Sequence, residues 1–294
     1  MPKCAFLTIK DLSDFECYDD KLISPMNQNG WECEFIPWDQ SNINWNNFDL
    51  AIIRSTWDYQ DRIQEFLDVL ENINLSNCIL ENSLELVKWN IDKSYLKELS
   101  KKKIQIVPSL FYESYSKKIL SDSFSFFSTN KLIIKPAISA NADDTFIIDT
   151  ENSEKISTML ENTFTNRKFI IQPFIENIML EGEYSLIFFE NTHSHTLVKK
   201  PKRGDFRVQE EHGGILTPVE KPDIKIVNEA KKILNSLPYK SLYSRIDFVK
   251  RENHFLLMEV ELIEPSLYFN LNPNAAKKFA SIINKKFQKQ FRSI

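Results

Sequence analysis

The chain has 294 residues, of which 42% are hydrophobic and 27% are charged, an ordinary composition for a soluble globular protein. It contains no apolar run of about 18 residues or more, so no membrane span is expected. The formal net charge is −4, and lysines are interspersed with acids along the chain, which argues against a nucleic-acid-binding surface.

The four cysteines, Cys4, Cys17, Cys33 and Cys78, all lie in the first third of the chain and form no CxxC pair. This pattern argues against a structural zinc site or a disulfide framework. The N-terminus turns acidic after a short apolar stretch, which indicates a first strand and not a signal peptide. We therefore expect reduced thiols in a cytoplasmic protein.

Residues 1–85 alternate between strand and helix patterns. Strands are predicted at residues 4–9, 33–37 and 48–53, and the last is a continuous apolar run typical of a strand covered on both faces. A helix is predicted over residues 62–75 because its apolar residues recur at helical spacing. Alternating β and α elements predict an α/β N-terminal domain with a small parallel sheet.

The middle segment, residues 86–180, is predicted to mix both element types. It begins with a helix that passes through residues 92–99. Further strands are predicted at residues 104–107, 131–136, 145–148 and 169–174, with a helix at residues 154–160.

The last segment, residues 181–294, is mainly β in pattern. Residues 183–189 and 195–199 predict one hairpin, and residues 245–250 and 255–261 predict a second. The chain ends in a basic amphipathic helix over residues 277–292. Fold class is therefore α+β behind an α/β N-terminal domain.

Three acids are predicted to converge on one face of the second hairpin. Glu259 and Glu261 alternate along one strand and project to the same side, and the hairpin brings Asp247 beside them. Carboxylates this close repel one another unless cations lie among them, and Mg²⁺ prefers oxygen ligands. The pattern favours a metal site, with Val260 and Leu262 in the core. The alternative is an exposed hairpin face with scattered acids.

Two lysines precede this hairpin in the sequence. Lys135 ends a buried strand before small residues, Ser139 to Ala142, that let backbone N–H groups approach a polyphosphate. The alternative is an edge-strand lysine followed by a turn. Lys93 lies in a predicted helix, where a lone lysine is usually solvated. Lys93 becomes a candidate because of the order of motifs along the chain. A first lysine is followed by a second lysine with its loop, then by the segment QPFIE, and then by the hairpin that carries the carboxylates.

This order of motifs resembles the ATP-grasp superfamily over most of the chain after about residue 85. The resemblance implies two α+β subdomains, residues 86–180 and 181–294, that clamp ATP between them. A smaller α/β domain, residues 1–85, would help to bind the substrate. The resemblance also implies ATP and Mg²⁺ as cofactors, with Mn²⁺ as an alternative metal.

The resemblance assigns roles residue by residue. It implies nucleotide-binding roles for Lys93 and Lys135, a hinge around adenine at Gln172, Pro173, Phe174 and Ile175, and a ribose contact at Glu183. It implies metal ligands at Asp247, Glu259 and Glu261, with Arg245 before them as a catalytic arginine.

Longer motifs point to a branch of the superfamily. IRSTWDY, GEYSLIFF, KKPKRGDFRVQEEHGG and MEVELIEP look like a glutathione-synthetase-like branch that includes the cycloserine-forming ligase. Two features depart from better-known members. The loop SANADDTF lacks the glycines that many relatives carry, and Glu261 stands where asparagine is common, which adds negative charge to the metal site.

A polar and aromatic cluster follows the buried strand at residues 48–53. Because ligands of a parallel sheet lie beyond the carboxyl ends of its strands, this cluster is a predicted substrate wall. Its members are Arg54, Ser55, Thr56, Trp57, Asp58 and Tyr59. The alternative is that the aromatic residues pack against the next domain.

A basic, glycine-containing stretch over residues 199–214 predicts a mobile lid. Lys199 and Arg207 are candidates to stabilise a transferring phosphoryl group, and Arg203 to hold a substrate carboxylate. The alternative is a disordered basic loop. His193 and His195 are expected to be solvated, because two ligands are too few for a metal site.

The sequence thus predicts an ADP-forming ligase that joins a carboxylate to an amine or thiol through an acyl phosphate. The expected substrate is a small amino-acid-like molecule, and a homodimer is possible. Two alternatives stay open: an intramolecular cyclo-ligase of the cycloserine-forming type, and a non-catalytic ATP-binding module. The identities of the acid and the nucleophile are open.

Overall fold

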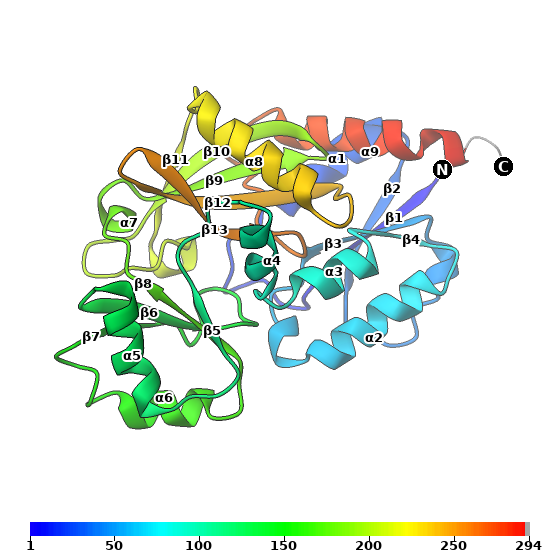
Figure 1. Ribbon diagram of the computed structural model, residues 1–294. Helices are drawn as coiled ribbons and strands as arrows, with labels where there is room; N and C mark the ends of the chain where they lie inside the picture. The colour runs from blue at the N-terminus through cyan, green and yellow to red at the C-terminus, as the bar shows by residue number, and fades with distance from the viewer. Residues whose placement is uncertain (292–294) are drawn as a thin grey trace.

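Three sheets organise the protein in the computed structural model, which describes the backbone of residues 1–291 and the side chains of residues 1–287 (Figure 1). The first sheet is parallel, as predicted, and the other two are antiparallel. Within residues 1–291, none of the helices combines the length and apolar character that crossing a membrane requires.

The N-terminal sheet has the strand order β2-β1-β3-β4. Its strands are β1 (Lys3–Thr8), β2 (Glu32–Pro37), β3 (Leu50–Ser55) and β4 (Ile79–Glu81). All six residues of β3 are buried, which confirms the prediction from its continuous apolar run. Helices α2 (Ile63–Asn74) and α3 (Leu84–Asn90) pack on one face of the sheet.

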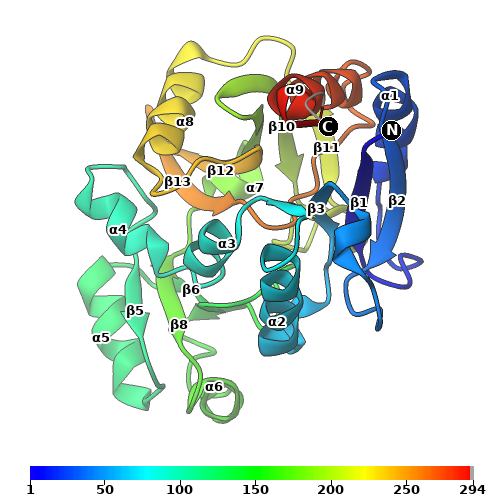
Figure 2. The same ribbon diagram turned by 90° about the vertical axis from the view of Figure 1, so that its right-hand side faces the viewer.

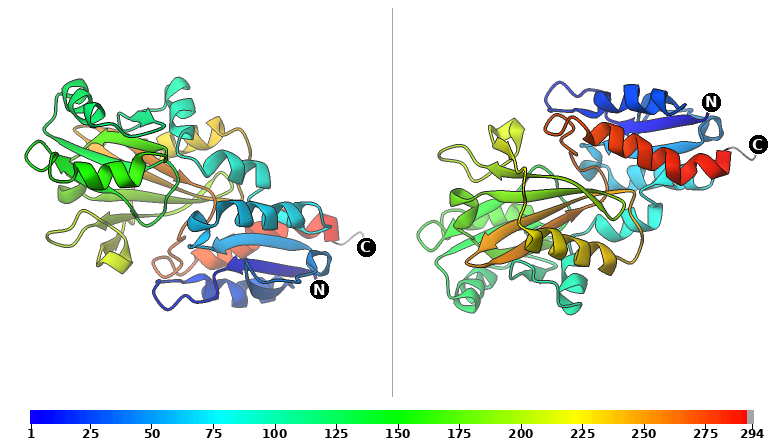
Figure 3. Two further views of the ribbon diagram at one scale, coloured as in Figure 1. Left: turned by 90° about the horizontal axis from the view of Figure 1, so that it is seen from below. Right: turned by 90° about the horizontal axis from the view of Figure 1, so that it is seen from above.

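The other face of this sheet packs against α1 (Ile23–Gln28) and the last helix, α9 (Ala275–Phe291). Figures 2 and 3 show the red α9 lying beside the blue α1, so the end of the chain returns to its beginning. Phe279 and Ile283 of α9 share a core with Phe6 of β1. The predicted terminal helix is confirmed as far as Phe291; Arg292, its last predicted residue, lies outside the described residues.

The central sheet has the order β5-β8-β6-β7. Its elements are β5 (Leu110–Tyr112), α5 (Lys117–Phe127), β6 (Lys131–Pro136), β7 (Phe146–Asp149), α6 (Ser157–Phe164) and β8 (Phe169–Pro173). Helices α5 and α6 cover one face. On β6, Leu132 and Ile134 turn to that core, which leaves Ile133 and Lys135 on the open face.

The third sheet has the order β11-β10-β9-β12-β13. Its strands are β9 (Glu183–Phe189), β10 (Thr192–Lys200), β11 (Ile215–Pro218), β12 (Tyr243–Arg251) and β13 (His254–Glu261). Both predicted hairpins are confirmed. Short helix α7 (Asn177–Leu180) precedes β9, and α3, α4 (Tyr95–Lys101) and α8 (Ile224–Ser236) pack on one face.

Two expectations about local structure are wrong, and one predicted helix is shifted along the chain. Residues 104–107 form a single bridge, Ile106 with Leu257, and no strand, because Ile104 turns into the core beside the third sheet. The helix expected at residues 154–160 lies later, at α6. His195 is not solvated, since it is only 9% exposed.

Side chains from the middle of the sequence pack beside the third sheet. Leu86, Leu96 and Leu99 share a core with Leu186 and Ile246 of that sheet. The chain is therefore interwoven in space, and the domain boundaries near residues 85 and 180 stay a prediction.

Candidate active site

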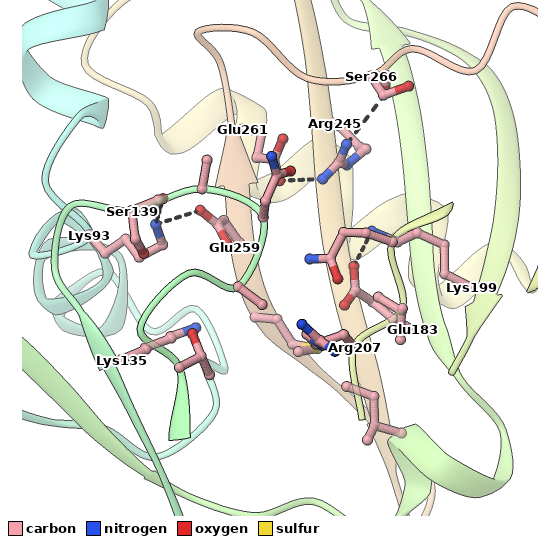
Figure 4. Close-up of a pocket in the computed structure, with 18 of the residues that line it drawn as sticks. Lys93, Lys135, Ser139, Glu183, Lys199, Arg207, Arg245, Glu259, Glu261 and Ser266 are labelled. Atoms are coloured by element: carbon pink, nitrogen blue, oxygen red, sulfur yellow. Dashed lines mark hydrogen bonds and ion pairs between the residues drawn. The ribbon is translucent and has the colours of Figure 1, made fainter. Parts of the chain in front are cut away.

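A pocket lies between the open faces of the central and third sheets, with N-terminal residues at one end (Figure 4). All the residues that the sequence predicts to bind the nucleotide line it: Lys93, Lys135, Ser139, Gln172, Pro173, Phe174, Ile175 and Glu183. It is also lined by Trp57, Lys199, Arg207, Arg245, Glu259 and Glu261. Motifs that are far apart in the sequence therefore converge on one cavity.

Strand alternation produces the charged wall of this pocket. Ile246 and Phe248 of β12 turn to the core beneath the sheet, which places Arg245 and Asp247 on the opposite face. Across the ladder, Arg245 pairs in register with Glu261, and Asp247 pairs with Glu259. The hairpin therefore places the three acids on one face, but only Glu259 and Glu261 line the pocket. Asp247 is 2% exposed, so this is not a solvent-exposed face of scattered acids.

Asp247 is held by three side chains. The Ser185 hydroxyl donates to its Oδ1 at 2.5 Å, Arg245 Nε lies 3.0 Å from Oδ2, and Lys199 Nζ lies 3.8 Å from Oδ2. Burial alone would raise the pKa of Asp247, but Arg245 and Lys199 outweigh it and hold the pKa below its usual value. Asp247 is therefore a carboxylate at neutral pH.

Glu261 shares the Arg245 guanidinium with Asp247. Burial raises the pKa of Glu261 to about 8 against the lowering effect of Arg245, and Asp247 and Glu259 add to the rise. The wall thus carries more negative charge than Arg245 alone neutralises, so a cation bound there would favour the ionised form of Glu261.

Lys199 is paired with Glu183 and belongs to the sheet, not to a mobile lid. It is the penultimate residue of β10, is 2% exposed, and forms an ion pair with the Glu183 carboxylate (Figure 4). Against the lowering effects of burial and Arg245, Asp247 and Glu183 raise the pKa of Lys199. Lys199 is therefore a fixed cation beside the acids. The predicted ribose-binding acid, Glu183, is engaged by this lysine.

Lys93 links the acids to the loop that follows β6. It lies in the turn before α4 and is buried, and its Nζ donates to Ser139 O at 2.7 Å and lies 3.2 Å from Glu259 Oε1. Lys135 lines the same cavity, and among residues 1–287 it has no ion-pair partner. Burial lowers the pKa of Lys135, and Glu259 partly opposes that effect. An anionic ligand would restore it.

The loop after β6 folds into two successive turns. Asp143 N donates to Ala140 O, and Thr145 N donates to Ala142 O. Asn141, Ala142 and Asp144 have φ angles of 50°, 59° and 50°, the left-handed region that glycine occupies most easily. The expected glycine-free phosphate loop therefore adopts a glycine-like backbone.

The far end of the pocket has an apolar wall. Phe174 lies under the Lys131 ammonium, which is 4.0 Å from the ring centroid, and the Gln172 amide donates to Ser109 Oγ at 2.9 Å. Further apolar residues, none of them singled out from the sequence, are Val107, Ile133, Ile178, Val249 and Met258. Such a wall suits a flat aromatic base. Alternation on β6 was the sequence signal for Ile133.

Comparison with known proteins assigns the chain to a protein family. Residues 92–261, more than half of its length, match the family described as ATP-grasp domain. The chain belongs to the ATP-grasp family. Residues 4–82 match the family described as D-cycloserine synthetase DcsG, N-terminal domain. The predicted recognition and fold class are thereby confirmed: this is an ATP-grasp fold with an N-terminal parallel-sheet domain, related to DcsG.

Individual relatives agree with this assignment. The cycloserine biosynthesis protein DcsG of Streptomyces lavendulae is 23% identical over 279 residues, 86% of this chain and 88% of that protein. The crystal structure of D-cycloserine synthetase DcsG superposes with a TM-score of 0.83 at 22% identity, covering 97% of this chain and 99% of that one. D-alanine–D-alanine ligase from Bacillus anthracis, complexed with ATP, gives 0.68 at 16% identity and 99% coverage of both chains. As predicted, the homologues are ATP-grasp ligases.

The ATP-grasp family uses ATP and Mg²⁺, and the three acids are the predicted magnesium ligands. Within residues 1–287, no group of three or more His, Cys, Asp or Glu side chains is clustered closely enough to hold a metal ion. The donors nevertheless fit Mg²⁺ chemically, since Asp247, Glu259 and Glu261 offer carboxylate oxygens on one face. At present Arg245 and Lys93 occupy these oxygens.

Residues 206–211 of the predicted lid line the pocket. Arg207 lines it and is held by both oxygens of Asp205, at 3.1 and 2.8 Å. His212 Nε2 lies 3.3 Å from Asn141 O in the loop after β6. Arg203, expected to hold a substrate carboxylate, is exposed and does not line the pocket.

The predicted substrate wall is only partly in the pocket. Arg54 and Ser55, the last residues of β3, and Thr56, which follows the strand, are fully buried and do not line it. Asp58 accepts hydrogen bonds from Arg62 and Trp38 instead of facing the pocket.

Sequence reasoning missed several lining residues at this end: Glu16, Glu210, Glu264, Ser266 and Tyr268. Glu264 and Ser266 lie in or directly after the motif MEVELIEP, which was the available signal. Their position in the pocket depends on how the chain leaves β13, which strand alternation does not predict.

Proposed function

We propose that this protein is an ATP- and Mg²⁺-dependent ligase that activates a small amino-acid-like carboxylate as an acyl phosphate. An amine, or a thiol, would then displace phosphate, so that ATP becomes ADP and phosphate as the amide or thioester forms. The observation that carries this proposal is the junction of Lys93, Glu259 and Ser139, where a phosphate loop meets the carboxylate wall.

The charged side chains and the loop that line the pocket would each have a role in this reaction. Lys93 and Lys135 would bind phosphate oxygens, and the loop at Ser139 would direct backbone N–H groups at them. Arg245 and Arg207 would neutralise charge that develops on the transferring phosphoryl group. Bound magnesium would add a Lewis acid that neutralises phosphate oxygens.

A second candidate is supported by the match to D-cycloserine synthetase DcsG. In that case the carboxylate and the nucleophile belong to one molecule, and the reaction closes a ring. Product mass separates the two candidates: cyclisation yields the mass of one substrate minus water, and ligation yields the sum of two minus water.

The test is a phosphate-release screen over amino acids and dipeptides with ATP and Mg²⁺. We expect ADP and phosphate in equal amounts with the right acid and nucleophile. Formation of AMP and pyrophosphate would refute the acyl-phosphate route. ATP binding without turnover on any substrate would favour a non-catalytic module.

The four cysteines are free, which supports the expected cytoplasmic location.

A further inference from the structure

The segment that leaves β13 is fixed residue by residue. Five consecutive backbone carbonyls, from Leu262 to Ser266, each accept a hydrogen bond from a different side chain. The donors are, in chain order of the acceptors, Asn82 at 2.6 Å, Tyr243 at 2.8 Å, Trp57 at 2.8 Å, Arg54 at 3.0 Å and Arg245 at 3.4 Å. A backbone held at every carbonyl presents its side chains in fixed positions, which is what a specific binding site needs.

Two of these donors were predicted to touch substrate. Arg54 is fully buried, pairs with Asp19 and donates to Pro265 O, so it acts on the pocket through the segment 262–266. The Trp57 indole donates to Glu264 O and also lines the pocket. Both are positioning residues for whatever this segment presents.

The segment presents one acid to the pocket, Glu264. The neighbouring acids Glu183, Glu259 and Glu261 each have a lysine or arginine nitrogen within ion-pair distance. Glu264 has no such partner among residues 1–287, although its carboxyl accepts a hydrogen bond from the Tyr59 hydroxyl. It is a carboxyl group in a fixed position, open to the cavity and lacking a cation.

We propose that Glu264 binds a protonated amino group of the substrate. The inference rests on the proposed function, because it takes the ligand in this pocket to be amino-acid-like. A carboxylate that is partly withdrawn from water and lacks a cation gains most from a charged N–H donor. Lys93 does not fill this role, since it already bonds Glu259 and Ser139 O.

The electrostatics of the site agree with this assignment. Burial raises the pKa of Glu264 to about 7, with Lys93 opposing the rise and Glu259 adding to it. An ammonium group beside Glu264 would lower that pKa again and hold the carboxylate form.

The experiment measures binding and not turnover. Wild-type protein, saturated with ADP and Mg²⁺, is titrated with D- and L-amino acids and with their des-amino acids, such as alanine against propionate and serine against 3-hydroxypropionate. The same titrations are run on Glu264→Gln. We expect the variant to bind the preferred amino acid about 10- to 100-fold more weakly than wild type does, because one hydrogen bond between charged groups is lost. Its affinity for the des-amino acid should equal that of wild type.

Glu211→Gln is the matched control, because it removes the same charge from an exposed residue at the rim of the same pocket. It should leave the preference for amino compounds intact. Equal losses in the two variants would show a general negative potential and overturn the proposal. So would unchanged amino-acid binding by Glu264→Gln, or the absence of any amine that binds the wild type.

This inference and the proposed function fail separately. Phosphate release by wild type, with the amine preference kept in Glu264→Gln, leaves the ligase and removes the role of Glu264. Amine binding that depends on Glu264, without phosphate release on any substrate, leaves the binding site and removes the ligase.

Discussion

Asp247 and Glu259 face each other across the β12–β13 ladder, and different cations hold them. Arg245 and Lys199 lie beside Asp247, whereas Lys93 lies beside Glu259. Arg245 also bonds Glu261, so loss of one acid does not strand the guanidinium in the core. The charges of these acids can therefore be removed one at a time.

We predict that Asp247→Asn and Glu259→Gln each lower the turnover number by at least about 100-fold, the scale found for one electrostatic contact to a reacting group. The acids would hold magnesium against the phosphates, and an amide binds it more weakly. Phosphate release measures the effect, and cooperative thermal unfolding verifies the fold. Glu181→Gln, whose carboxylate pairs with Lys250 outside the pocket, should keep activity. Loss of cooperative unfolding in the pocket variants would assign the acids a structural role.

His195 gives a prediction about acid stability. Burial, reinforced by His193, lowers the pKa of His195 to about 4, below the ordinary value near 6.5. Between about pH 6.5 and pH 4, the His195 imidazole is therefore protonated in the unfolded chain but neutral in the folded chain. The free energy of unfolding falls as the pH drops through this range. The loss is on the order of 3 kcal/mol at about 1.4 kcal/mol per pH unit.

Denaturant unfolding at several pH values tests this effect. His195→Gln should flatten the decline between pH 6.5 and pH 4 relative to wild type. His254→Gln is the matched control, since His254 is exposed on β13, and it should reproduce the wild-type slope. A slope that does not change in His195→Gln would show that other groups carry the acid sensitivity.

The positions of residues could be predicted from the sequence where local geometry decides them. Alternation along a strand was sufficient to place Glu259 and Glu261 on one face. It was not sufficient for Arg54 or Glu264. The bond from Arg54 to Pro265 O joins residues 211 positions apart, and the one from Trp57 to Glu264 O joins residues 207 apart. Long-range contacts of this kind depend on the assembled fold.

At the scale of elements, the loop after β6 forms its two turns without glycine. Ala142 has a φ of 59°, where a Cβ crowds the backbone, whereas Ala140 in the same loop has no positive φ. Glycine at residue 142 would remove that crowding. At residue 140 it would only add freedom to the unfolded chain.

We predict that Ala142→Gly has a free energy of unfolding equal to that of wild type or higher, by up to about 1 kcal/mol. Ala140→Gly should have a free energy of unfolding lower than that of wild type, by a few tenths to about 1 kcal/mol. The free energy of unfolding in denaturant measures the difference between the two variants. If Ala142→Gly were the less stable variant, the left-handed backbone at this residue would be in doubt.

Whole elements were predicted where one pattern dominated the sequence. The apolar runs of β3 and β8 and the paired strands of both hairpins were found. Helix α5 was overlooked because three of its residues are serines, which ordinarily favour turns. In α5, Ser123 and Ser125 donate to the carbonyls four residues earlier, at 2.7 and 3.0 Å, so the helix satisfies hydroxyls that the pattern counted against it.

At the scale of the molecule, α9 joins the two ends of the chain. Phe279 lies in a core that contains Phe6 of the N-terminal sheet and Phe189 of the third sheet. Its ring centroid is 4.7 Å from that of Phe189 and 6.0 Å from that of Tyr243. The Tyr243 hydroxyl, whose single proton is shared between Ile263 O and Ile53 O, lies 2.6 Å from Ile53 O, so the two sheets share both a core and a buried hydrogen-bonding group.

Because this core belongs to both sheets, we predict that Phe279→Ala destabilises the whole protein and not α9 alone. Removing a fully buried phenylalanine costs about 3–5 kcal/mol. Circular dichroism and tryptophan fluorescence should report one denaturant transition, shifted to lower concentration by the same amount with both probes. Phe126→Ala on α5, where the side chain is 69% exposed, should change stability by about 0.5 kcal/mol or less. Two separate transitions, only one of them shifted, would show that the N-terminal and third sheets unfold independently and that α9 does not couple them.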